Sequence, residues 1–311
     1  MRISIEKALA LLNSGKVVSV PTETVYGLAA SLDRLQAIQE IYKLKGRPAN
    51  NPLIIHVAQL QDVFDYLQEN ISDLDILAHD FWPGPLTIVL PVKCKLIPSI
   101  VRADLPTAAF RIPKHPVALN LLKLTGPLVM PSANLSGRPS STQPEHVEHD
   151  FGIDFPVLDG GPCEKGLEST IIIYRDGKWE IIRRGALVPE HFKSTLGYLP
   201  LVQDVVTNDA PLCPGQMYRH YAPKARLMLV DSFEIIKEGV IIGFSGRTYP
   251  KGCRLLALGP LSEPDLAASN LYSILRQIDK EGHASAYVDM NFPKTGILAT
   301  LAERLHKAAM N

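Results

Sequence analysis

The sequence predicts an α/β protein, with a mixed α/β or α+β sheet domain followed by a small Rossmann-like domain. Three observations lead to this class. Short apolar runs typical of strands alternate with patterns that repeat every three to four residues, as in helices. The 311 residues exceed what one hydrophobic core usually supports. A proline-rich stretch at 199–225 has no sustained periodicity and the composition of a linker.

Strands and helices alternate over the first 200 residues. A first helix is expected from Ile5, after a cap at Ser4, to a stop near Gly15. A second helix at 35–44 is expected to end at Gly46. Further helical patterns lie near 60–70, 73–80 and 116–124. Strands are expected at 17–20, 53–57, 86–90, 108–112, 128–130, 169–174 and 179–182.

Residues 226–311 follow a simpler alternation. Strands are expected at 227–230, 240–244, 253–258 and 284–288, with helices around 271–278 and 298–305. The glycines of this region do not form the GxGxxG pattern of dinucleotide-binding domains. We therefore place the first domain at 1–200, a linker at 201–225 and the second domain at 226–311.

Composition excludes several classes of protein. The 32 Lys and Arg balance the 32 Asp and Glu, and hydrophobic residues make up 46%, so neither a disordered acidic protein nor binding through bulk positive charge is expected. The four cysteines form no CxxC pair and fit free thiols in a reducing compartment. The N-terminus lacks a signal-peptide core, and no apolar run approaches the ~18 residues of a membrane span. We expect a soluble cytoplasmic protein without a membrane span.

Common catalytic motifs do not occur in the sequence. It contains no GxxxxGK[ST], HExxH or GxSxG. His146 and His149 have an HxxH spacing, but no third ligand accompanies them, and a solvated helix face is the better interpretation. The sequence therefore predicts no metal site made by the chain itself.

Polar residues at the ends of apolar strands are the distinctive feature. Lys45 and Arg47 follow a predicted helix on a tight Gly/Pro loop, where both could converge on one anion. Ser132 and Asn134 directly follow a strand, where α/β sheets bind ligands. His56 should project from the strand face opposite to Leu53, Ile55 and Val57. Taken singly, each could instead be structural, as a residue favoured by the helix dipole or as a turn former.

Taken in order, these segments resemble the YrdC-like family in its long, two-domain form. The matching segments within about 10–190 are PTETVYGL, KGRPANNPLIIHV, FWPGPLT, AFRIP, PSANLSG, GLESTI and RRG. The stretch PGQMYRHYAPKA matches the linker that distinguishes the long form. The resemblance implies a twisted α/β sheet with a central, positively lined cavity, a linker that lies across the cavity mouth as a lid, and a Rossmann-like C-terminal domain.

The resemblance also implies an activity. Members of this form are nucleotidyltransferases that make L-threonylcarbamoyladenylate and pyrophosphate from L-threonine, bicarbonate or CO2, and ATP. This is the first step of the threonylcarbamoyladenosine modification next to the tRNA anticodon. The resemblance further implies Mg2+ bound with the ATP, transfer of the product to the tRNA threonylcarbamoyl-transfer complex, and at most a weak tRNA contact.

Site residues carry over position by position. The threonine pocket would comprise Thr24, His56, Arg111, the backbone at Met130, and Ser169. The ATP site would comprise Arg47, Asn51, Thr107, Ser132, Asn134, Ser140, Arg183 and Tyr221. Lys45 and Arg47 would stabilise charge, and no dedicated general base is identified, although His56 is an option. Ser141 and Arg184 stand where the family often has proline, so the phosphate contact is assigned to Arg183, and Arg184 is placed on the surface.

Two other functions remain open from the sequence. A non-catalytic RNA-binding module could use the basic cavity as a groove, but the zero net charge and the absence of an RNA-binding signature count against it. A carbamoyl-adenylate enzyme of the hydrogenase-maturation type contains a similar domain, but its flanking acylphosphatase and zinc-finger segments do not occur in this sequence.

Overall fold

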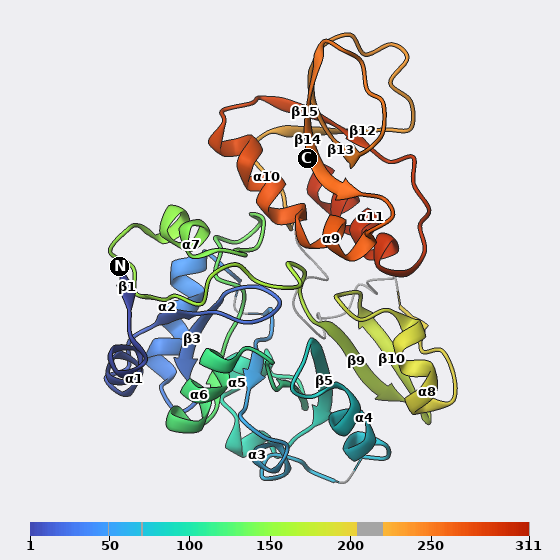
Figure 1. The fold of residues 1–311 in the computed structure, drawn as a ribbon. Helices are drawn as coiled ribbons and strands as arrows, with labels where there is room; N and C mark the ends of the chain where they lie inside the picture. The colour runs from blue at the N-terminus through green and yellow to red at the C-terminus, as the bar shows by residue number, and fades with distance from the viewer. Residues whose placement is uncertain (49, 70, 204–219, 311) are drawn as a thin grey trace.

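The computed structural model describes residues 1–48, 50–69, 71–203 and 220–310. Within these ranges the strands form an eleven-stranded sheet and a four-stranded sheet. Figure 1 shows the smaller sheet and its helices lying against one side of the larger domain. The predicted linker at 201–225 lies mostly outside the described residues, at 204–219.

The larger sheet contains all the strands predicted for the first domain, with ends shifted by at most one residue. Its order is β1-β8-β2-β3-β7-β4-β6-β5-β9-β10-β11. The strands are β1 (Arg2–Ile3), β2 (Val18–Val20), β3 (Gly27–Ser31), β4 (Ile54–His56), β5 (Leu86–Pro91), β6 (Thr107–Arg111), β7 (Leu128–Val129), β8 (Val157–Leu158), β9 (Thr170–Arg175), β10 (Lys178–Arg183) and β11 (Leu201–Val202).

Four of these strands, β1, β3, β8 and β11, were not expected from the sequence. β3 has the sequence GLAAS, which is poor in β-branched residues, so strand propensity does not reveal it. It forms because β2 and β7 both pair with it antiparallel, within the buried interior. β11 pairs parallel with β10 inside the segment expected to be linker. The sheet therefore continues two residues beyond the boundary expected at 200.

The helices of the first domain cover the sheet. They are α1 (Ile5–Asn13), α2 (Leu35–Lys45), α3 (Gln61–Phe64), α4 (Leu74–Phe81), α5 (Ser99–Arg102), α6 (Pro116–Thr125), α7 (Pro144–Phe151) and α8 (Lys193–Leu196), with short 3-10 turns at Cys94–Leu96 and Pro189–Phe192. The predicted ends of the first two hold: Ser4 accepts from the Lys7 amide, and Gly46 adopts a left-handed φ of 61°. The helix expected at 60–70 is short, because Leu67 pairs with Val92 in a β-bridge.

The two HxxH histidines lie on α7 and differ in burial. His149 is exposed, as expected for a solvated face. His146 is half-buried, and its Nδ1 accepts a hydrogen bond from the Thr142 amide at 3.2 Å. Burial, and then the Arg276 charge, lower the pKa of His146 to about 3. The interpretation as a solvated face is therefore wrong for His146. The described residues contain no cluster of His, Cys, Asp or Glu that could hold a metal.

The two faces of the large sheet separate its core from its site. Leu53, Ile55 and Val57 belong to the main hydrophobic core. The opposite face carries a separate buried apolar cluster made of Ile54, Val89, Ala109, Ile171, Ile173 and Ile182. His56 shares its strand face with Ile54, as the alternation of the strand predicts. This face supports the pocket described below.

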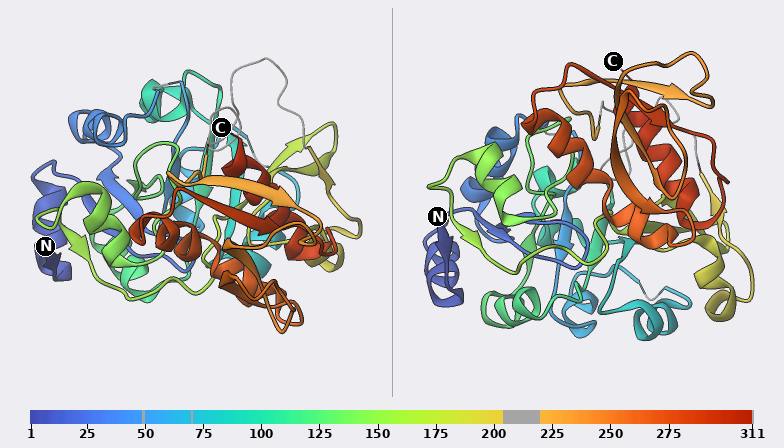
Figure 2. Two further views of the ribbon diagram at one scale, coloured as in Figure 1. Left: turned by 90° about the horizontal axis from the view of Figure 1, so that it is seen from above. Right: turned by 45° about the horizontal axis from the view of Figure 1, so that its top comes forward.

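The second domain is a four-stranded parallel sheet of order β12-β15-β13-β14. Its strands are β12 (Arg226–Val230), β13 (Gly239–Ser245), β14 (Cys253–Pro260) and β15 (Ser285–Asp289), and its helices are α9 (Pro264–Ser269), α10 (Leu271–Lys280) and α11 (Gly296–Ala309). Figure 2 shows these helices between the small sheet and the first domain. Val25 and Leu167 of the first domain belong to the core cluster of the second, so the two domains share buried apolar surface.

Candidate active site

A pocket forms where several strands of the large sheet begin or end. Its walls come from the turn between β2 and β3, the ends of β4, β6, β7 and β10, the loop after α2, and the residues just before β9. The lining residues are Thr22, Thr24, Val25, Tyr26, Gly27, Arg47, Ile54, His56, Arg111, Met130, Pro131, Ser132, Glu168, Ser169 and Arg183. The fold therefore brings together all five residues predicted to bind threonine and three of those predicted to bind ATP.

A buried ion pair fixes Arg111 at the end of β6. Its Nη2 lies 2.6 Å from Glu23 Oε1, and both side chains are about 5% exposed or less. Glu23 Oε2 accepts from the Lys114 amide at 3.0 Å, and Arg111 Nε donates to Gly84 O at 3.2 Å. These bonds use part of the five-donor guanidinium and set its direction. Arg111 is thus held in one orientation at the pocket.

His56 is a neutral imidazole in this site. Burial, followed by the nearby Arg111 charge, lowers the pKa of His56 well below 6.5. Its Nδ1 lies 3.3 Å from Ile54 O, which favours the tautomer with the proton on Nδ1. In that tautomer Nε2 is an acceptor.

Ser169 and Arg183 form one unit at the β9 and β10 side of the pocket. Arg183 Nη2 donates to Ser169 O at 2.8 Å and to Ser169 Oγ at 3.0 Å. The Ser169 hydroxyl also shares a 2.7 Å hydrogen bond with the Thr87 hydroxyl. Because all three side chains are buried, their positions depend on one another.

Some residues predicted to bind ATP lie near the starts of β4 and β6, whereas His56 and Arg111 lie at the ends of these strands. Arg47 Nη2 donates to Pro52 O at 2.9 Å and to Asn51 O at 3.2 Å. The parallel register pairs Ile54 with Ala109, which brings Thr107 beside Pro52. Thr107 does not line the pocket, and at ~3.3 Å per residue it lies roughly 13 Å along β6 from Arg111. Thr107 therefore lies at the other end of β6 from Arg111, whereas Arg47, Ser132 and Arg183 line the same pocket as the residues predicted to bind threonine.

Lys45 contacts a loop and does not line the pocket. Its Nζ donates to Ser132 O at 2.5 Å and to Asn134 O at 2.6 Å. Burial, and then the Arg47 charge, lower the pKa of Lys45 well below 10.5. The geometry thus supports Lys45 as a support for the loop after β7, while direct charge stabilisation by Lys45 stays a prediction.

Asn134 and Ser140 belong to that same loop, outside the pocket lining. The Asn134 amide donates to the carbonyls of Leu135 and Arg138, so it braces the turn. Ser140 Oγ donates to Glu168 Oε1 at 2.6 Å. The side-chain oxygens of Asn134 and Asn51 are buried and have no hydrogen-bond partner among the described residues. Such acceptors fit a ligand that carries N–H groups.

Tyr221 is buried against the second domain, outside the pocket lining. Its ring stacks on Tyr272 at 5.3 Å, and the Arg304 guanidinium lies 4.7 Å above it. The lid predicted for 218–224 includes Tyr218 and Arg219, which lie outside the described residues. Arg184 was expected on the surface, but it is half-buried, and its carbonyl accepts from Arg304 at 2.6 Å.

Three residues of this region were missed by the sequence reasoning: Glu23, Glu168 and Arg304. Glu23 lies in PTETVYGL and Glu168 in GLESTI, and both motifs adjoin strand ends. A charged residue among buried neighbours at such a position indicates a functional site. Arg304 is fully buried and pairs with Glu168, with 3.3 Å between Nε and Oε2. Arg304 lies on an amphipathic helix, where a charged residue is expected in solvent, so its sequence carries no such signal.

Known proteins match both domains. Residues 10–185 match the family model described as "Telomere recombination", and residues 187–310 match "Threonylcarbamoyl-AMP synthase, C-terminal domain". The threonylcarbamoyl-AMP synthase of Bacillus subtilis is 36% identical, covering 98% of this chain and 92% of its own length. That of Pyrococcus abyssi is 35% identical, covering 97% and 93%. The crystal structure of P. abyssi Sua5 complexed with L-threonine has a TM-score of 0.89 at 33% identity, covering 99% and 96%. The chain therefore belongs to the threonylcarbamoyl-AMP synthase family, in the form that carries both domains.

Proposed function

We propose that the chain joins L-threonine, bicarbonate or CO2, and ATP into L-threonylcarbamoyladenylate, with release of pyrophosphate. The observation that carries this proposal is the pocket itself. It gathers Arg47, Arg111 and Arg183 with hydroxyl and imidazole groups from segments far apart in the chain. The close match of both domains to threonylcarbamoyl-AMP synthases supports the same reaction.

Threonine would bind at the end of β4 and β6. Arg111, directed by Glu23, has donors left for the substrate carboxylate. Thr24, His56 and Ser169 would hydrogen-bond the substrate hydroxyl, and the neutral His56 offers Nε2 as an acceptor. We propose no dedicated general base for deprotonating the amine.

ATP would extend toward the start of the same strands. Arg47 and Arg183 would align the triphosphate while the threonine carbamate attacks the α-phosphorus. Both reactants are anions, so these guanidinium groups offset their repulsion. The unpartnered Asn51 oxygen would accept from an N–H of the nucleotide. The remaining ATP assignments, for Thr107, Ser132, Asn134, Ser140 and Tyr221, stay part of this proposal.

Mg2+ would arrive with ATP. The described residues offer no cluster of acidic or other ligands for a metal, and Mg2+ typically binds substrate phosphates and water. Its contribution would be neutralisation of phosphate charge. Chelation by EDTA should then abolish activity without changing the unfolding temperature, since the metal would be bound through ATP and not through the fold.

The product would be passed on quickly, because a mixed anhydride of a carbamate and a phosphate hydrolyses readily in water. We propose that it goes to the tRNA threonylcarbamoyl-transfer complex in the cytoplasm, with little direct contact between this chain and tRNA. No helix in the described part of the chain is long and apolar enough to cross a membrane.

The proposed function is tested by pyrophosphate release from ATP that depends on both threonine and bicarbonate, with the adenylate identified by mass. Arg47→Ala should lower kcat/KM at least tenfold, because a charged contact to the phosphates is lost. An unchanged rate would refute this site assignment. Salt-sensitive RNA binding without any ATP conversion would favour the RNA-binding module instead.

Selectivity for threonine gives a second test. 2-Aminobutyrate lacks only the hydroxyl, and its binding would leave buried polar groups of the pocket unpaired at a cost of about 1–3 kcal/mol each. We expect kcat/KM to fall at least tenfold with 2-aminobutyrate. Equal kcat/KM values would exclude recognition of the hydroxyl.

A further inference from the structure

Two arginines of the second domain are buried against the first. Arg276 on α10 is 9% exposed, and Arg304 on α11 is fully buried. Lone buried cations are costly, so both must be paired. Their partners lie in the segment that follows the pocket residue Ser132 and in the pocket residue Glu168.

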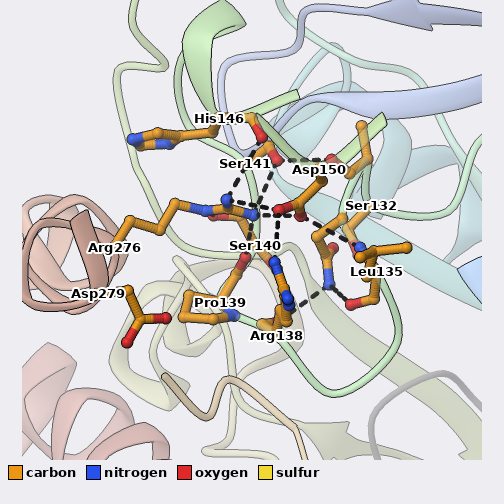
Figure 3. A network of polar contacts seen from close by, with 12 residues as sticks. Ser132, Leu135, Arg138, Pro139, Ser140, Ser141, His146, Asp150, Arg276 and Asp279 are labelled. Atoms are coloured by element: carbon orange, nitrogen blue, oxygen red, sulfur yellow. Dashed lines mark hydrogen bonds and ion pairs between the residues drawn. The ribbon is translucent and has the colours of Figure 1, made fainter. Parts of the chain in front are cut away.

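Arg276 binds the loop 135–141, which leads away from Ser132 (Figure 3). Its Nη2 donates to Pro139 O at 2.6 Å and to Ser141 Oγ at 3.2 Å, while Nε donates to Ser140 O at 3.4 Å. Nη2 also lies 2.8 Å from Asp150 Oδ2. Because one guanidinium contacts three successive residues, it fixes the path of the loop.

Asp150 links this arrangement back to the start of the loop. The same carboxylate accepts from the Leu135 amide at 3.2 Å and pairs with Arg138 at 3.4 Å. Burial alone would raise the pKa of Asp150, but the Arg276 hydrogen bond and charge hold it below 3.8. Asp150 is therefore ionised at neutral pH and fixes both ends of the loop to Arg276.

The second contact runs through Glu168. One carboxylate oxygen accepts from Ser140 Oγ at 2.6 Å, and the other accepts from the Tyr272 hydroxyl at 2.8 Å and from Arg304 Nε at 3.3 Å. Tyr272 and Arg304 belong to the second domain. Ser140 is thus fixed twice by that domain, at its carbonyl by Arg276 and at its hydroxyl through Glu168.

The first domain anchors this loop at both ends. Lys45 donates to Ser132 O and Asn134 O, the Ser136 amide donates to Lys45 O, and the Tyr26 amide donates to Ser141 O at 2.8 Å. Between these anchors, the described contacts of Pro139 and Ser140 come from Arg276 of the second domain and from Glu168. The position of Ser140 therefore depends on the contact between the two domains.

We propose that Arg276, together with Tyr272 acting on Glu168, is a positioning residue for the nucleotide half of the site. The second domain holds the 135–141 loop in the geometry that ATP requires, and threonine binding does not depend on it. This inference rests on the proposed function, which assigns Ser140 to the ATP site. Neither residue touches the reacting atoms, so each acts through Ser140 and the loop.

The test compares Arg276→Ala, Tyr272→Phe and the control Lys280→Ala in the full chain. Lys280 is exposed on the same helix, and its removal changes the net charge as Arg276→Ala does. Tyr272→Phe removes only the hydroxyl that Glu168 accepts and keeps the ring that stacks on Tyr221. The readouts are KM for ATP and for threonine, kcat, ATP affinity by calorimetric titration, and the unfolding temperature.

We expect Arg276→Ala to raise KM and Kd for ATP about tenfold, and Tyr272→Phe about threefold, as charge-assisted or neutral hydrogen bonds are lost. KM for threonine should stay within twofold in both, and Lys280→Ala should match the wild type. Equal rises in the two KM values, or no change in ATP affinity, would overturn the proposal and leave a purely structural contact. If Arg276→Ala does not fold, the same comparison of ATP and threonine binding in Tyr272→Phe tests the proposal.

Wild-type measurements separate this inference from the proposed function. A wild-type protein that binds ATP but makes no adenylate would refute the proposed reaction, while the ATP affinities of the variants would still test the positioning role. A wild type that makes adenylate, with variants of unchanged ATP affinity, would refute the positioning role alone.

Discussion

Arg111 illustrates how one buried contact orients a residue that lines the pocket. Its charge is offset by Glu23 at 2.6 Å, and Glu23 is itself oriented by a backbone amide. The desolvation of both groups is already complete before a substrate arrives, so little reorganisation is needed on binding. The same principle applies to Arg183, which Ser169 orients through three hydrogen bonds.

Glu23→Gln should therefore destabilise the fold and weaken threonine binding. The substitution keeps the shape but leaves the Arg111 charge buried without its counterion, at a cost of about 3 kcal/mol. Urea denaturation gives the free energy of unfolding, and KM for threonine should rise more than KM for ATP. Glu40→Gln is the control, since Glu40 lies on the surface and pairs with the exposed Lys43. Equal stability of the two variants would contradict the role of the pair.

His146 gives a pH-dependent prediction at the same scale. Its pKa is about 3 in the folded chain against 6.5 in a free side chain, because of burial and then the Arg276 charge. The neighbouring Asp150 opposes this shift, while His149 and Lys280 add to it. The unfolded chain therefore binds a proton that the folded chain excludes, and stability is full above about pH 6.5 and falls as the pH drops toward 3.

His146→Asn should make this fall shallower. Asparagine supplies an oxygen near the position of Nδ1 to accept from the Thr142 amide, but it does not titrate. Between about pH 6 and 4 the slope of unfolding free energy against pH should decrease by about 1.4 kcal/mol per unit, which corresponds to one proton. Parallel curves for the variant and the wild type would show that His146 does not carry this dependence.

At the scale of elements, loops that follow strands connect the two domains. Three successive residues before β9 have different roles. Leu167 belongs to the core of the second domain, Glu168 pairs with Arg304 of that domain, and Ser169 lines the pocket. At Gly166 the backbone runs so close to α9 that an added Cβ would lie 2.1 Å from Ser269 O. Only glycine permits this approach together with a φ of +60°.

Gly166→Ala should separate the domains locally, whereas Gly161→Ala serves as a control. Both glycines have positive φ, but nothing lies within 4 Å of a Cβ at Gly161. Each alanine costs about 1–2 kcal/mol for its left-handed backbone, and the clash adds about 1–3 kcal/mol at Gly166 only. Thermal unfolding should show the larger loss for Gly166→Ala. Equal losses of stability would mean that the domain interface accommodates the added methyl group at Gly166 without further destabilisation.

At the scale of the whole molecule, the two sheets behave as parts of one structure. Val25 and Leu167 lie in the second domain's core, and the Arg276–Asp150 and Arg304–Glu168 pairs cross the boundary. Burial alone would raise the pKa of Glu168, but Arg304 and Arg183 hold it below 4.5, so the second pair is charged at neutral pH. Separating the domains would expose apolar surface and leave buried charges unpaired.

Calorimetry should therefore show a single unfolding transition for the full chain. The calorimetric and van't Hoff enthalpies should agree, because neither domain keeps its buried contacts without the other. Two separate transitions, or an enthalpy ratio well above one, would show that the domains unfold independently.

The sequence alone predicted the local elements with strong signals. The TIIIYR run of β9 and the capped helix after Ser4 follow from side-chain period and capping chemistry, which act between residues near in the chain. The pocket was predicted to the extent that polar residues follow strands, since a sheet gathers strand ends. β3 and the short α3 differ because pairing with neighbouring strands overrides local preference.

By itself, the sequence thus determined the α/β class, the family and eight of the residues that line the pocket, because these depend on local pattern and motif. Only the tertiary structure decided that Lys45 supports a loop, that Thr107 lies at the far end of β6, and that Arg276 and Arg304 pair with buried carboxylates of the first domain. On a helix, a charged side chain has the same sequence signature whether it faces water or a buried carboxylate. The partner that distinguishes the two lies more than 120 residues away along the chain.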